Sequence, residues 1–230
     1  MALHVSYRAH EAEAQAEAEV QARVQAQAAA AGQPYLLTLK NQSAQPWTFY
    51  VYQRMPGQSN DVFSLAWFAS PFVITPGNRI SFEWQIDYNF VWGTTGTVIP
   101  GITFNAGGEI ITSPDGSNTT TFSTKPGPNL SSAVKAPPAG SLVIKDADDV
   151  PNSTYSVGIG MSGTGTFVVQ AGPNLTHQFT PTPSYWIAAG SEVKVGTVLN
   201  IQTVTRTTEV KFPVSVYSQT RTLNESNIWV

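Results

Sequence analysis

The hydrophobic and polar positions of this chain follow one pattern over the first 32 residues and another over the rest. From Glu11 to Ala28 they alternate without a break: every odd position is polar and every even one is Ala or Val. Period two is typical of a β-strand, because successive side chains point to opposite faces. Ala, Glu, Gln and Arg nevertheless favour helices over strands. Pattern and composition therefore predict different structures for this N-terminal arm, residues 1–32.

Composition favours a helix over residues 9–31, about 35 Å long and ended by Gly32 before Gln33 and Pro34. A narrow seam of small residues would line up at every fourth position. Such a seam buries too little apolar surface to hold a helix alone, so we expect it to form an assembly interface. The alternatives are a strand about 75 Å long, donated to a neighbouring molecule, and disorder. The predicted interface residues are Ala12, Ala16, Val20, Val24 and Ala28.

From Tyr35 onward, short apolar runs alternate with turn residues, which predicts strands. In Phe82–Trp92, large apolar side chains alternate with mostly polar ones, so we expect a single half-buried strand there. Val98–Phe104 and Glu109–Thr112 predict a hairpin, and residues 113–140 predict irregular connections. The remaining predicted strands are Tyr35–Lys40, Trp47–Gln53, Thr119–Ser123, Ser141–Lys145, Tyr155–Ile159, Thr166–Gln170, Leu175–Phe179, Tyr185–Ala188, Glu192–Leu199, Gln202–Phe212 and Val214–Leu223.

No change of composition divides residues 33–230, so we predict one all-β domain there, an antiparallel β-sandwich or jelly roll. Charged residues make up only 12% of the 230 residues, against about 25% in a typical protein. Without the arm, which holds two Arg and four Glu, the body keeps 10 basic and 11 acidic residues. A nearly neutral surface favours association over repulsion. It also offers no basic patch for nucleic acid.

The chain contains no cysteine, which rules out disulfides and thiolate metal sites. Residues 1–8 lack the basic start and apolar run of a signal peptide. No stretch approaches the roughly 18 apolar residues of a membrane helix. We therefore expect no membrane span and a cytoplasmic location, with export by a non-classical route as the alternative.

Three groups of residues invite a catalytic or cofactor interpretation, and each has a structural alternative. Gly158, Gly160 and Gly163 match the dinucleotide pattern, but strand-forming residues follow where that motif needs a helix. His177 is the only histidine outside the arm, and no serine lies in a nucleophile-elbow motif. Glu83 and Asp87, four residues apart on a strand, would lie about 13 Å apart, too far for a glycosidase pair. We therefore predict no enzyme activity and no cofactor.

Two other groups of residues, an acidic cluster and the tryptophans, could bind a ligand. Asp146, Asp148 and Asp149 form the only acidic cluster, which could hold calcium or lie in a solvated turn before Pro151. The six tryptophans are expected mostly in the core, with one or two free to stack on a sugar ring. These tryptophans are Trp47, Trp67, Trp84, Trp92, Trp186 and Trp229.

Several stretches of residues 33–230 together resemble the RhiA proteins of rhizobia, which are expressed in the rhizosphere. The resemblance implies an abundant, inducible and soluble bacterial protein, and it carries over no active site. The arm itself has no counterpart in this resemblance. The matching stretches are Val51–Gln53, Pro56–Asp61, Ser64–Phe68, Ile86–Trp92, Pro100–Phe104, Val157–Gln170 and Pro183–Trp186.

Two functions remain open from the sequence. The favoured one is a non-enzymatic structural protein that assembles with copies of itself into a filament or lattice, with the arm docking between subunits. The alternative is a soluble recognition module, such as a carbohydrate-binding protein acting between a bacterium and its host.

Overall fold

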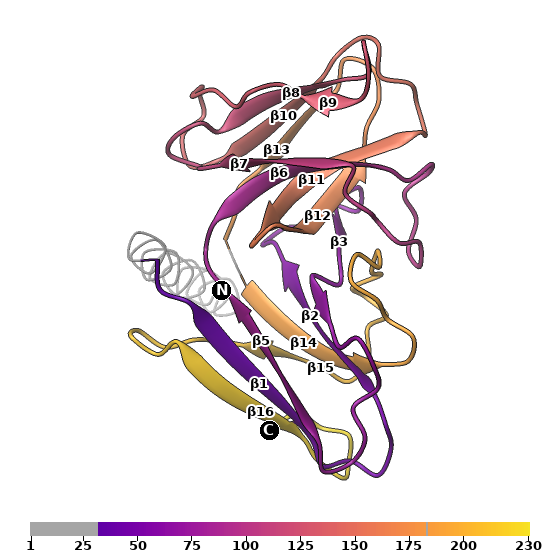
Figure 1. The fold of residues 1–230 in the computed structure, drawn as a ribbon, viewed down its shortest axis with the longest axis vertical. Helices are drawn as coiled ribbons and strands as arrows, with labels where there is room; N and C mark the ends of the chain where they lie inside the picture. The colour runs from indigo at the N-terminus through magenta and orange to yellow at the C-terminus, as the bar shows by residue number, and fades with distance from the viewer. Residues whose placement is uncertain (1–31, 183) are drawn as a thin grey trace, which may run out of the picture.

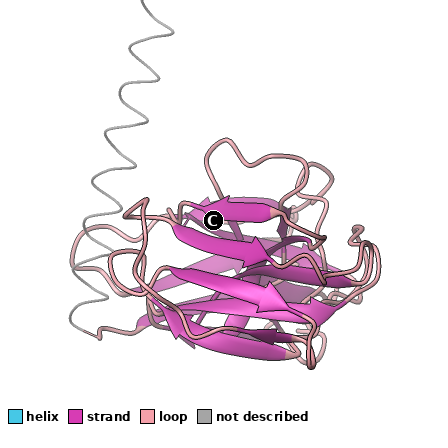
Figure 2. Ribbon diagram, turned by 90° about the horizontal axis from the view of Figure 1, so that it is seen from above, coloured by secondary structure: helices cyan, strands magenta, loops and turns pink. Residues whose placement is uncertain are grey.

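The computed structural model describes residues 32–182 and 184–230, and these residues form strands and loops without a helix (Figures 1 and 2). The predicted all-β fold is therefore confirmed. The strands are β1 (Tyr35–Asn41), β2 (Thr48–Arg54), β3 (Phe63–Ser64), β4 (Phe68–Ala69), β5 (Arg79–Trp84), β6 (Tyr88–Thr94), β7 (Gly108–Thr112), β8 (Thr119–Ser123), β9 (Asn129–Leu130), β10 (Leu142–Asp146), β11 (Tyr155–Met161), β12 (Thr164–Gln170), β13 (Thr176–Phe179), β14 (Ser184–Gly190), β15 (Thr207–Val210) and β16 (Ser218–Leu223).

The first sandwich is built from both ends of the described chain. Its two sheets have the orders β16-β1-β5 and β15-β14-β2-β4 (Figure 1). Their facing side chains form an aromatic core, in which the Tyr35 and Trp84 rings stack with centroids 5.8 Å apart. Large aromatic side chains dominate the buried area, so this core holds the two sheets together.

The second sandwich is formed by the chain between β5 and β14, together with the short strand β3. Its sheets have the orders β13-β10-β8-β9 and β3-β12-β11-β6-β7, and it occupies the upper part of Figure 1. A separate core fills the space between them, with Phe90, Phe122 and Phe179 fully buried or nearly so. Most pairs are antiparallel, as predicted, and the structure adds two parallel pairs, β1 with β16 and β8 with β10.

Two predicted strands are loops that cover the outer faces of the sheets. Val98–Phe104 and Glu192–Leu199 meet at a single bridge between Thr103 and Thr197. Their apolar side chains pack on the outer face of the β3-β12-β11-β6-β7 sheet and bury Val91 and Val168. Both predictions were wrong for the same reason: the apolar side chains that these loops bury against a sheet resemble those of a strand in the sequence. The predicted hairpin does not form either, since β7 pairs with β6.

The predicted strand Phe82–Trp92 was also wrong, because it divides between the two sandwiches. β5 ends at Trp84 in the first sandwich, and β6 begins at Tyr88 in the second. Between them Gln85 donates its backbone N–H to Ser162 Oγ at 2.9 Å, and Asp87 Oδ1 accepts the Ser162 N–H at 2.7 Å. Buried and exposed side chains keep alternating through this crossover: Trp84 and Ile86 are buried, and Gln85 and Asp87 are exposed.

We expect Trp84→Ala to lower the free energy of unfolding by about 3–5 kcal/mol, because it empties a large volume in the first core. Gln85→Ala, next to it on the exposed side, should have little effect. Urea denaturation of both variants measures the difference, and similar small losses at the two positions would show that the aromatic core is not what holds this sandwich.

Candidate functional site

The predicted interface residues of the arm, Ala12 to Ala28 at every fourth position, lie outside the described residues. The described chain enters the body at β1, the central strand of the three-stranded sheet β16-β1-β5. The outer face of this sheet carries hydroxyl side chains, and Thr38 and Ser81 are hydrogen bonded across β1 and β5 at 2.8 Å. The body surface nearest the arm in sequence is thus polar and almost uncharged at its centre.

Strand β5 forms an open edge of that sheet. The Asn41 N–H donates to the Asn78 carbonyl at 2.9 Å, so in the β1–β5 register the backbone groups of Ile80, Phe82 and Trp84 face β1. The backbone N–H and C=O groups of the alternate residues therefore point away from the sheet. No other described segment hydrogen bonds to them. These residues, Arg79, Ser81 and Glu83, also have exposed side chains.

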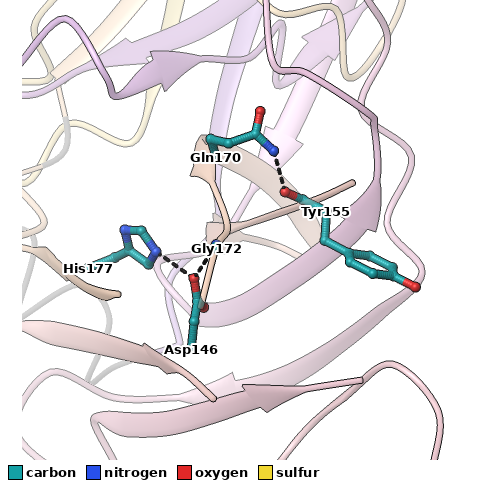
Figure 3. Close-up of polar contacts among 5 residues, drawn as sticks. All are labelled: Asp146, Tyr155, Gln170, Gly172 and His177. Atoms are coloured by element: carbon teal, nitrogen blue, oxygen red, sulfur yellow. Dashed lines mark hydrogen bonds and ion pairs between the residues drawn. The ribbon is translucent and has the colours of Figure 1, made fainter. Parts of the chain in front are cut away.

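His177, the only catalytic candidate with an acid partner, is paired with Asp146 at the end of the second core (Figure 3). His177 Nε2 lies 2.9 Å from Asp146 Oδ2. The Asp146 side chain is fully buried, whereas that of His177 is 13% exposed. The same oxygen accepts the N–H of Gly172 at 3.0 Å. The pair thus joins strands β10 and β13 to the segment that follows β12.

This pair lacks the third member that nucleophilic catalysis requires. Among the described residues, no hydroxyl group is hydrogen bonded to the imidazole of His177, which pairs with Asp146. The nearby Gln170 side chain donates to the backbone carbonyl of Tyr155 at 2.7 Å, which ties the ends of β12 and β11 together (Figure 3). These hydrogen bonds stabilise the edge of the second core, because a buried carboxylate such as that of Asp146 needs partners.

The three acidic residues for which the sequence left calcium binding open, Asp146, Asp148 and Asp149, do not converge. The Asp146 carboxylate is hydrogen bonded to His177, and the Asp148 side chain is exposed. Asp149 Oδ2 accepts the Ser123 hydroxyl at 2.9 Å and the Thr124 N–H at 3.1 Å. Although desolvation opposes the shift, these hydrogen bonds hold the pKa of the Asp149 carboxyl below its ordinary value. Within the part of the chain that the structure describes, no group of acidic and histidine side chains has the arrangement of a metal site.

The three glycines of the dinucleotide-like pattern lie in the β11–β12 hairpin, with a strand rather than a helix on each side. A Cβ atom on Gly158 would lie 1.9 Å from the Phe167 carbonyl oxygen, and one on Gly160 would lie 2.4 Å from that of Thr164. Gly163 occupies the turn with a φ of 70°. These glycines serve close backbone approach and a tight turn.

Half of the six tryptophans are core residues, and the others pack partly against the cores. Trp67, Trp84 and Trp229 are buried, while the other three are partly exposed. Two of the partly exposed rings already carry a guanidinium group over one face, Arg54 over Trp186 at 3.9 Å and Arg206 over Trp47 at 4.2 Å. These cation–π contacts use the ring surface that a sugar would need.

The described residues therefore define an all-β protein of two packed sandwiches, and no helix in this part of the chain is long and apolar enough to cross a membrane. The chain belongs to the RhiA family, whose sequence profile matches residues 32–230. It is 57% identical to Protein RhiA of Rhizobium leguminosarum bv. viciae over 229 residues, which cover 100% of this chain and 98% of that protein. This similarity also includes the arm, which the resemblance noted in the sequence did not cover. No solved structure matches the chain.

We expect His177→Ala to lower the free energy of unfolding by about 1–3 kcal/mol, because it leaves a buried oxygen of Asp146 without its imidazole partner. Thr176→Ala, on the same strand with an exposed side chain, is the matched control and should be nearly neutral. Equal stabilities of the two variants in urea denaturation would mean that the pair does not support the core.

Proposed function

We propose that this protein is a non-enzymatic structural subunit that assembles with copies of itself into a filament or lattice, and that the arm docks between subunits. The observation that carries the proposal is the open edge of β5. Natural proteins usually cover such edges or block them, because free backbone groups pair readily with another chain. An exposed edge on the sheet whose central strand follows the arm in the chain is consistent with a surface used for association.

The charge distribution supports the same function. The body has 10 basic and 11 acidic residues, so copies of it would repel one another only weakly. The arm differs from the body in composition, and its small side chains allow two backbones to approach closely. A segment of this kind gains most of its contacts from a second surface rather than from itself.

We expect deletion of residues 1–32 to leave the body folded and to abolish assembly. The double variant Val20→Asp with Val24→Asp should do the same, because buried carboxylates without partners cost several kcal/mol, and this cost recurs at every contact between subunits. The matched control is Gln25→Asp with Gln27→Asp, which adds the same charge at polar positions of the arm and should retain assembly.

Circular dichroism checks the fold of each variant, and size-exclusion chromatography with light scattering and negative-stain microscopy measures assembly. If the truncated protein and the Val20/Val24 variant assemble like the wild type, the arm is not the connector. Dispersed monomers of the wild type would instead favour the recognition module.

A further inference from the structure

We propose that residues 19–24 of the arm add to the open edge of β5 in a second copy, as a strand parallel to β5. This inference rests on the proposed function and specifies where the arm docks. The acceptor is the row of outward-facing backbone groups at Arg79, Ser81 and Glu83, whose side chains are exposed. An added strand would hydrogen bond to these groups and extend the β16-β1-β5 sheet.

The charges along the two segments match in a parallel register. Placing Glu19 beside Arg79 puts Arg23 beside Glu83, because both pairs are four residues apart. Gln21 then lies beside Ser81, so that two polar groups face each other between the charged pairs. An antiparallel strand centred on the same position would bring Arg23 to Arg79 and Glu19 to Glu83. Since like charges on neighbouring strands are destabilising and opposite charges are favourable, the parallel direction is preferred.

The apolar side chains match in the same register. Val20 and Val24 are the only valines between residues 9 and 31. They would lie on the core side of the sheet, beside Ile80 and Trp84 respectively. Ala22, between them, would lie beside the much larger Phe82 and so leave room for its ring. Ile80 is only partly buried at the edge of the first core, so the added strand would cover apolar surface that is now partly open.

Period two is the feature of the arm that this contact requires. A strand places Glu19, Gln21 and Arg23 on the outer face and the apolar residues on the inner face, as β5 itself does. A helix would present neither a row of free backbone groups nor these two faces. Ala and Glu are weak strand formers, so this strand would form on the β5 template rather than in isolation.

The central experiment reverses the charges on each side separately in the full-length protein. The edge-reversed variant is Arg79→Glu with Glu83→Arg, and the arm-reversed variant is Glu19→Arg with Arg23→Glu. Each replaces two attractive pairs by two repulsive ones, so each alone should raise the concentration needed for assembly by about tenfold or more. The matched control is Asp115→Arg with Lys135→Glu, which makes the same exchange at exposed loop positions of the second sandwich and should assemble like the wild type.

Mixing the two reversed variants in equal amounts identifies the acceptor. If the arm of one copy binds β5 of another, each variant complements the other and the mixture assembles at the wild-type concentration. If the mixture stays dispersed while one chain carrying all four substitutions assembles, the arm binds its own β5 and the inference is wrong. If each variant assembles like the wild type while arm deletion still abolishes assembly, the inference fails and the proposed function stands. A wild type that never assembles overturns both.

A backbone variant tests the same edge without changing charge. Ser81→Pro removes an N–H that points away from β1 and places the ring where the added strand would lie, and proline is tolerated at such edge positions. Ser81→Ala is the control, since it loses only the hydrogen bond to Thr38. We expect Ser81→Pro to stay folded by circular dichroism and to lose assembly, while Ser81→Ala keeps it. Assembly of a folded Ser81→Pro protein would contradict strand addition at this edge.

Discussion

The way the two sandwiches are joined depends on one contact, the packing of the β11–β12 hairpin tip against the first core. Met161, at this tip, is buried among the residues of the first sandwich, and its carbonyl oxygen accepts the indole N–H of Trp67 at 2.9 Å. The next residue, Ser162, bonds to the backbone of Gln85 through its hydroxyl. A buried indole N–H without an acceptor is costly, so this contact fixes where the chain leaves β5 and how the second sandwich lies against the first.

Sequence patterns predicted most of the strands, because short apolar runs between turn residues are a local property. They could not show that Phe82–Trp92 divides at Gln85, since the crossover keeps the same alternation of buried and exposed side chains. They also could not separate Glu192–Leu199, a covering loop, from a strand. Those distinctions depend on partners far away in the chain, such as the hairpin tip at Ser162.

The candidate sites were less predictable than the fold. No pattern in the sequence pointed to a partner for His177, because Asp146 lies 31 residues away and meets it only when β10 pairs with β13. The open edge of β5 was likewise invisible, since it follows from the order of strands in the sheet. The alternation of the arm, in contrast, is evident from the sequence. Its charges can be matched to those of Arg79 and Glu83 only once the structure shows that these two residues lie on the open edge of β5.

Backbone hydrogen exchange of β5 tests the central claim, strand addition between copies, most directly. The amides of Ser81 and Glu83 point away from β1, whereas those of Ile80 and Phe82 are bonded to it. In assembled wild-type protein we predict that all four amides are protected, and that in the arm-reversed variant only Ile80 and Phe82 remain so. Equally fast exchange of the Ser81 and Glu83 amides in both proteins would contradict the claim.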